Sequence, residues 1–123
     1  MRIRLVLISV ILVIITSTIT SADDCWSALA RNTETHEIVI KTGPTRQAAV
    51  GLAKQTLGGE PNAIVWAWGF NSCLAIAVDT ENDKIFGVGS GLTLEKAIEE
   101  SLKICGSVRS SKKCEIKLTH CCR

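Results

Sequence analysis

The fold is decided by residues 73–106, CLAIAVDTENDKIFGVGSGLTLEKAIEESLKICG. An apolar run over residues 73–78 leads into a polar segment, 79–83, whose Asp, Thr and Asn side chains bond to nearby backbone in turns. The chain then returns through the mainly β-branched and aromatic residues 85–88. This order predicts a β-hairpin.

A helix is expected after the hairpin. Apolar and small residues recur at i, i+3, i+4, i+7, i+8 and i+11 from Leu94 to Cys105, which places them on one face of an α-helix. Thr93 precedes the series as an N-cap, and Glu95 lies in the first turn, where the helix dipole favours negative charge. We expect Gly106 to end the helix in the left-handed conformation.

A fainter copy of this unit occupies residues 26–58. Its triplet Ala28-Leu29-Ala30 aligns with Ala75-Ile76-Ala77, and both triplets lead into a polar turn and a β-branched return strand. Thr45 and Gly58 stand where the second copy has its N-cap and terminal glycine. Two copies are too few for a solenoid, so they predict a single pseudo-symmetric domain.

Each copy is completed by one further strand, expected at residues 63–70 and 114–118. The repeats then span about 25–72 and 73–123, each with the order ββαβ, inside one domain, 23–123. A crossover helix makes its flanking strands parallel. We therefore predict the α+β class: one mixed sheet of about six strands, with both helices on one face and braced by disulfides.

Residues 1–22 have the plan of a secretory signal peptide. Arg2 and Arg4 form a basic start, residues 5–15 are rich in Leu, Val and Ile, and small residues follow. The apolar core is short for a membrane span of about 20 residues. We expect cleavage after Ala22 and a mature protein that is secreted or periplasmic.

Cleavage changes the charge balance. The chain has 14 basic and 12 acidic residues, and the leader holds Arg2 and Arg4 and no acid, so twelve of each remain. A neutral chain lacks the basic surface that nucleic-acid binding requires. We expect neither a nucleic acid nor stable membrane association after cleavage.

The six cysteines all lie in the exported part, at positions 25, 73, 105, 114, 121 and 122. An even number in a small exported domain indicates disulfides, with fifteen pairings open to six cysteines. Cys105 with Cys114 is the best-supported pair, because it ties the helix end to the following strand. The first copy has Leu57 and Ala63 at this corner, so an apolar contact can replace the bridge there.

The other four cysteines leave their pairing open. Cys25 and Cys73 begin the two copies, and Cys121 and Cys122 end the chain. We expect the tail to be tied back to the strand starts.

The residues that resemble a known family are Trp26-Ser27-Ala28-Leu29-Ala30, Cys73-Leu74-Ala75-Ile76-Ala77, Gly87, Gly89, Ala97, Cys105 and Cys114. This pattern resembles a bacterial family of small secreted domains of unknown function, frequent in mycobacterial and proteobacterial exported proteins. Its members show Trp-x-Ala-Ile-Ala or Cys-x-Ala-Ile-Ala hairpins and a helix-end Cys. The resemblance covers nearly the whole mature chain, although the first copy lacks the Cys pair after its helix. It implies export and a disulfide-braced α+β domain, and it implies no reaction.

Candidate chemistry is sparse. The glycines of 87–91 match neither a dinucleotide fingerprint, a phosphate loop nor a nucleophile elbow, and we interpret them as a bend between strand and helix. Cys114, His120, Cys121 and Cys122 are zinc-ligand types, but export favours their oxidation. A Cys121–Cys122 redox switch is the strained alternative. We expect no metal, no cofactor and no catalytic residue.

Two features bear on function. Trp66, Trp68 and Phe70 are at alternate positions of the strand 63–70, so we expect them to line one face of it, either as core under the helices or as an exposed anchor for a partner protein. His36 and His120 are the only histidines. Our first hypothesis is a non-enzymatic protein-binding module, an inhibitor or immunity-type partner. The alternatives are a small exported hydrolase or thiol enzyme that uses one of the histidines, and a structural envelope component.

Overall fold

The computed structural model describes residues 24–110 and 113–122, so the expected signal peptide, 1–22, lies outside the described residues. Within these residues, six strands, two helices and one 3₁₀ turn follow each other. They are β1 (Trp26–Asn32), β2 (Ile38–Gly43), α2 (Arg46–Thr56), β3 (Ala63–Phe70), β4 (Cys73–Asp79), β5 (Phe86–Gly91), α3 (Leu94–Ser107), η1 (Val108–Ser110) and β6 (Cys114–Cys121).

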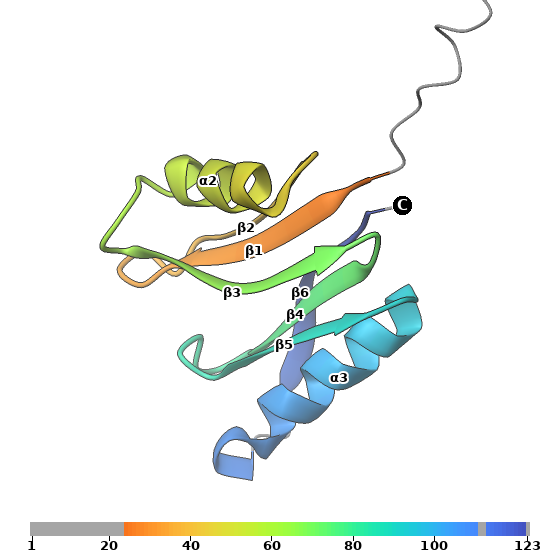
Figure 1. The fold of residues 1–123 in the computed structure, drawn as a ribbon. Coiled ribbons are helices and arrows are strands. Elements are labelled where there is room, and N and C mark those ends of the chain that lie inside the picture. Colours follow the sequence, from red (N-terminus) through yellow and green to blue (C-terminus); the bar gives the residue numbers. More distant parts are fainter. Residues whose placement is uncertain (1–23, 111–112, 123) are drawn as a thin grey trace, which may run out of the picture.

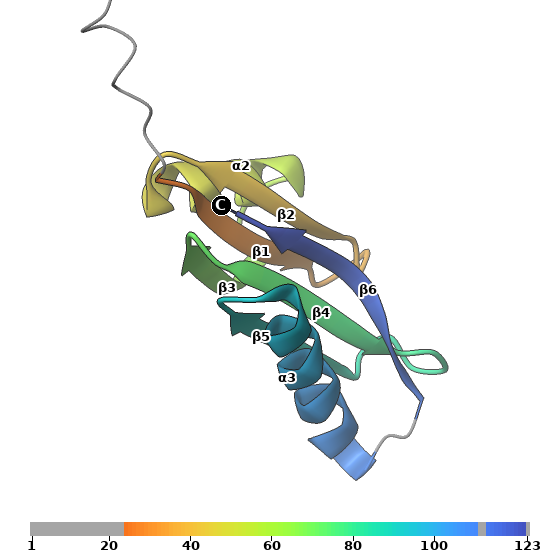
Figure 2. The same ribbon diagram turned by 90° about the vertical axis from the view of Figure 1, so that its right-hand side faces the viewer.

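The strands form two antiparallel sheets of three strands, with the orders β2-β1-β3 and β5-β4-β6. Figure 1 shows four layers: α2, the first sheet, the second sheet and α3. In both views β3 lies on the same side of the molecule as β5, and β2 on the same side as β6 (Figure 2). Each copy of the repeat thus supplies one sheet and the helix that covers its outer face.

The α+β class is confirmed, but the single mixed sheet with both helices on one face is wrong. In each copy the third strand pairs with the first strand of the hairpin, on the side opposite the second strand. The helix therefore connects two parallel strands that are not neighbours, and every pairing within a sheet is antiparallel. The central strands β1 and β4 also have two apolar faces, and the second face is buried only when the sheets stack.

Three apolar clusters separate the four layers. Ala28 and Ala30 face α2, where they meet Ala49 and Ala53. Leu29 points the other way, into the space between the sheets, where it meets large side chains of the second copy, namely Leu74, Ile76 and Val78. Cys73 and Ala75 face α3 and meet Ala97. The small-large-small triplets of the sequence thus place alanine under a helix and the large residue between the sheets.

The glycines of β5 have a different role from the expected bend. A Cβ at Gly89 would lie 2.3 Å from the Ala97 carbonyl oxygen and 2.5 Å from the Ser101 nitrogen of α3. A Cβ at Gly87 would be 2.3 Å from the Cys105 nitrogen. The glycines therefore let the helix backbone lie directly on the strand.

The helix starts follow the sequence prediction. Thr45 and Thr93 are the N-caps, and their hydroxyls accept hydrogen bonds from the backbone N–H groups three residues on, at 3.1 and 3.2 Å. Gly58 has the left-handed φ of 90° expected just past α2. Gly106 does not end α3, which continues to Ser107. The Ser107 hydroxyl donates to the Ile104 carbonyl at 2.7 Å and the Val108 N–H donates to the Cys105 carbonyl, so these two carbonyls have partners without a left-handed residue at 106.

Three disulfides brace the domain. Cys105 is bonded to Cys114, in agreement with the sequence prediction. The tail is tied back to the two strand starts, through Cys25–Cys122 and Cys73–Cys121. Cys25–Cys122 joins the two copies covalently at one end of the stacked sheets. In the first copy, Leu57 and Ala63 share a buried cluster at the corner where the second copy has Cys105–Cys114.

Candidate functional site

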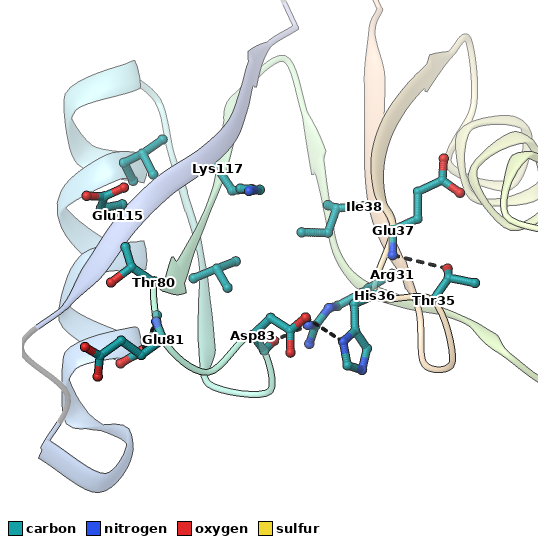
Figure 3. A pocket seen from close by; sticks show the side chains of 13 residues that line it. Arg31, Thr35, His36, Glu37, Ile38, Thr80, Glu81, Asp83, Glu115 and Lys117 are labelled. Carbon is teal, nitrogen blue, oxygen red and sulfur yellow. Dashed lines mark hydrogen bonds and ion pairs between the residues drawn. The ribbon is translucent and has the colours of Figure 1, made fainter.

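A polar cleft of about 540 Å³ opens at the end of the sandwich opposite the tail disulfides. The turns after β1 and β4 and the start of β6 form it (Figure 3). Its charged lining consists of five carboxylates and two cations: Glu37, Asp79, Glu81, Asp83, Glu115, Arg31 and Lys117. The cleft therefore has an excess of negative charge.

His36 and Asp83 connect the two turns. His36 has a left-handed φ of 65°, and its Nδ1 donates to Asp83 Oδ2 at 2.8 Å. Figure 3 shows the two side chains meeting between the turns. This hydrogen bond is the main cause that lowers the pKa of Asp83 below its usual range, and the charges of His36 and Arg31 act in the same direction. The pair thus links the two copies at the end that has no disulfide between them.

Arg31 lies beneath this pair. Arg31 is only 5% exposed. Its Nη2 donates a hydrogen bond to the Asp83 carbonyl oxygen, and its guanidinium lies over the Phe86 ring, 4.5 Å from the ring centroid. Burial lowers the pKa of the guanidinium, and the neighbouring Asp83 opposes this shift. The corresponding residue of the second copy is Val78. The first copy thus has a cation where the second has an apolar residue, and this cation contacts the opposite turn through a hydrogen bond and the start of β5 through a cation–π contact.

The His36–Asp83 pair is the part of the structure that most resembles catalytic machinery. An oriented histidine becomes a general base for a nucleophile only when a hydroxyl or thiol lies within hydrogen-bond reach. Among the described residues, no hydroxyl is recorded in a hydrogen bond with His36, and all six cysteines are in disulfides. The His36–Asp83 hydrogen bond instead joins the turn after β1 to the turn after β4.

A second candidate site is the outer edge of β3. Ile64, Trp66, Trp68 and Phe70 are 39%, 49%, 51% and 44% exposed. Within the described part of the chain β3 pairs with β1 alone, so its other edge is unpaired. The expectation of a single aromatic face is wrong, because the pairing register with β1 shifts at Trp66. This β-bulge places the aromatic residues on both faces of the strand.

The faces can be read from the contacts. Trp66 packs edge-on against Phe86 of the second sheet, with ring centroids 5.0 Å apart. Trp68 lies on the opposite face, under the guanidinium of Arg46 from α2, which is 5.3 Å from the ring centroid. Phe70 is on the same face as Trp68 and contacts Trp26 at 5.1 Å. Aromatic surface thus surrounds the free edge of β3 on both sides.

The second copy provides an internal comparison for this edge. β6 pairs with β4 in the same register as β3 with β1, including the bulge, which falls at Lys117. By this register, Ile64, Trp66, Trp68 and Phe70 of β3 correspond to Glu115, Lys117, Thr119 and Cys121 of β6. The fold therefore accommodates charged and polar residues where β3 has exposed aromatic ones. The large exposed side chains of β3 are not a requirement of the architecture.

Two hollows flank Trp68 between α2 and β3. One, of about 310 Å³, is lined by Arg46, Gln47, Val50 and Trp68. The other, of about 520 Å³, extends past Val65 to Lys54 and Glu60. Lys54 Nζ is bonded to Glu60 at 2.6 Å, and this hydrogen bond is the main cause that lowers the pKa of Glu60. We call these two hollows together the α2–β3 groove.

The comparison with protein families matches residues 26–121 to a domain of unknown function, DUF4189. The chain belongs to this family. The match begins at β1 and ends in β6, so it covers both copies of the repeat. It agrees with the expected membership of a family of domains of unknown function. No curated protein and no solved structure matches the chain.

The DUF4189 domain has the covalent structure of a protein from an oxidising environment. Three disulfides in about one hundred residues are typical of extracellular and periplasmic proteins and rare in the cytosol. Within residues 24–110 and 113–122, no helix is long and apolar enough to cross a membrane. The same residues contain no group of three or more His, Cys, Asp or Glu side chains placed to hold a metal ion.

The structure separates the residues that the sequence grouped as possible metal ligands. Cys114, Cys121 and Cys122 are each bonded to a different cysteine, so no thiolate is available for a metal or for a Cys121–Cys122 switch. His120 is an exposed residue of β6. Sequence reasoning missed Arg31 and Asp83. The signal for Arg31 was present in the repeat, because the duplication aligns this charged residue with an apolar one.

Proposed function

We propose that this DUF4189 domain is an exported, non-enzymatic protein-binding module of the inhibitor or immunity type, and that it binds its partner through the outer edge of β3. One observation carries the proposal. Trp66 and Trp68 are about half exposed on β3, whose outer edge is unpaired in the described structure, at positions where the second copy has Lys117 and Thr119. Exposed apolar edges promote aggregation unless they are used, and Trp is among the residues most enriched at binding hot spots.

The cleft supports a small exported hydrolase less well. Its His36–Asp83 pair would need a nucleophile, and the described hydroxyl groups make no recorded hydrogen bond to the ring. A thiol enzyme would need a free cysteine, and all six are paired. A purely structural envelope component would not need an aromatic binding edge. The secreted or periplasmic location is part of this proposal and is supported by the disulfides.

Site-specific photo-crosslinking tests the proposal. The full chain, expressed with its own leader in the cells that produce it, carries p-benzoylphenylalanine at position 66 or, as a matched control, at position 52. Leu52 is 45% exposed on α2 and is not one of the residues that line the α2–β3 groove. We expect a discrete adduct with another protein from position 66, none from position 52, and loss of the adduct when Trp68→Thr is added. Equal adducts from both positions, or none from either, would contradict the proposal.

A further inference from the structure

The α2–β3 groove contains a charge that is not neutralised within the described structure. α2 has two basic residues and no acidic one. Lys54 is paired with Glu60, whereas the ion pairs recorded among the described residues do not include Arg46. The Arg46 guanidinium lies over the Trp68 ring, so its contact with the protein is through the cation face. Among the described residues the Arg46 N–H groups have no recorded ion-pair partner, so they are available to an acceptor on a bound partner.

The edge of β3 sets the conformation of what binds there. An edge strand that pairs on one side presents a row of free N–H and C=O groups on the other. Proteins use such edges to add an extended segment of a partner as one more strand, with side-chain pockets that provide specificity. The bulge places Trp68 on the α2 face and Trp66 on the face toward the second sheet. Alternate side chains of an added strand would meet these two rings in turn.

We infer that the α2–β3 groove binds an extended segment of a partner protein that pairs with the edge of β3 and places an Asp or Glu carboxylate against Arg46. This inference rests on the proposed function and names the chemistry of the partner. The apolar side chains of the segment contact Trp68 and Val65 on one face and Trp66 on the other. The carboxylate supplies the counter-ion that α2 lacks, and Arg recognises carboxylates through two parallel N–H donors.

A second copy of the chain would fit this surface less well. The eight residues of β3 include no acidic side chain. Paired copies would therefore bring an Arg46 from each chain to the joint surface without a carboxylate from either strand. Charge complementarity favours a different protein with an acidic residue next to the apolar segment.

Selection from a random twelve-residue peptide library tests the inference on the full, oxidised protein. We expect wild type to enrich peptides with alternating apolar residues and an Asp or Glu. Trp68→Thr should enrich no such motif, and Arg46→Glu should enrich Lys or Arg in place of the acid. For a selected acidic peptide, tryptophan fluorescence titration should show about three- to tenfold weaker binding to Arg46→Glu than to wild type. Leu52→Glu also places a glutamate on α2, outside the groove lining, and should leave the affinity within about twofold.

The outcomes separate the inference from the proposed function. Peptides without an acid, or a preference that Arg46→Glu leaves unchanged, would overturn the inference while the crosslinking at position 66 still supported the proposed function. The inference would also be overturned if the wild-type protein enriched no peptide motif beyond those that the Trp68→Thr variant enriches. A wild-type dimer in light scattering that Trp68→Thr dissociates would place a second copy on the edge and overturn it too. Absence of a crosslink at position 66 would instead contradict the proposed function, on which this inference rests.

Discussion

Gly89→Ala should destabilise the domain strongly, although it adds a single methyl group. The new Cβ would lie 2.3 Å from the Ala97 carbonyl oxygen and 2.5 Å from the Ser101 nitrogen. Both atoms belong to the backbone of α3, so no side-chain rotation can relieve the contact. The favourable separation of non-bonded heavy atoms is about 3.5 Å. To reach it, α3 would have to move away from β5 by about 1 Å.

The magnitude follows from what that movement separates. α3 covers the cluster of Cys73, Ala75 and Ala97, and lifting the helix opens this cluster along its length. Overpacking of this kind costs about 1–3 kcal/mol, and a rigid backbone neighbour places Gly89→Ala at about 3 kcal/mol. For a domain of this size, the midpoint of thermal unfolding should fall by more than about 10 °C.

Gly51→Ala is the matched control. Gly51 lies inside α2, and a Cβ there would meet nothing within 4 Å. Alanine is the better helix former, so this substitution should stabilise the domain by about 0.5–1 kcal/mol. Urea unfolding of the two oxidised variants, followed by circular dichroism, measures the difference of about 4 kcal/mol. If Gly89→Ala unfolds within about 0.5 kcal/mol of wild type, then α3 does not lie directly on β5 and the layer arrangement of the second copy is incorrect.

Three further predictions concern the disulfides, the turns and the edge. Replacing both Cys105 and Cys114 by alanine opens a loop of sequence separation 9 and should lower the free energy of unfolding by about 2.5–3 kcal/mol in urea; an unchanged midpoint would contradict a bracing role. The hydrogen bond from His36 lowers the pKa of Asp83 in the folded state, so its stabilisation is present above the unfolded value of about 4 and is lost as the pH falls through the lower folded value. Asp83→Asn should therefore flatten the decline in stability below about pH 4, and parallel unfolding midpoints of variant and wild type from pH 6 to pH 2 would refute the link. Trp68→Thr should lower the free energy of unfolding by only about 1–2 kcal/mol, because the residue is 51% exposed; a loss above about 3 kcal/mol would show that it is core.

The hairpin-and-helix unit could be predicted because its signals are local. Thr45, Thr93 and Gly58 cap the helices through hydrogen bonds and backbone conformations that involve neighbouring residues only. The Cys105–Cys114 pair is similarly local, with a sequence separation of 9. Such features depend little on how the two copies meet, so the repeat pattern was sufficient to place them.

The features that could not be predicted depend on how the strands pair and on how the two copies meet. Leu29 and Ile76 lie between alanines, and this alternation does not reveal that their face is covered by another sheet. The position of Trp66 depends on a bulge against β1, which a strict period of two cannot show. The bond between His36 and Asp83 joins residues 47 positions apart. The polar cleft was therefore beyond prediction from the residues alone, although the buried Arg31 was visible as a mismatch within the repeat.

The duplication makes this chain its own control, because each copy shows what the fold requires of the other. At the strand starts, the Trp26–Phe70 ring contact stands where the second copy has Cys73–Cys121. Phe70 thus has a structural counterpart, as Leu57 has in Cys105.

Trp66 and Trp68 have no such counterpart. The residues that match them, Lys117 and Thr119, form no equivalent contact recorded in the described structure, and they leave β6 with a polar edge. In the second copy the edge strand β6 has charged and polar side chains at these positions. In the first copy the edge strand β3 has apolar side chains there, and it lies beside Arg46, which is in none of the ion pairs recorded among the described residues. Selection for folding alone would not require this difference. It is therefore at Trp66 and Trp68, and not at the shared core, that a function specific to the domain is expected.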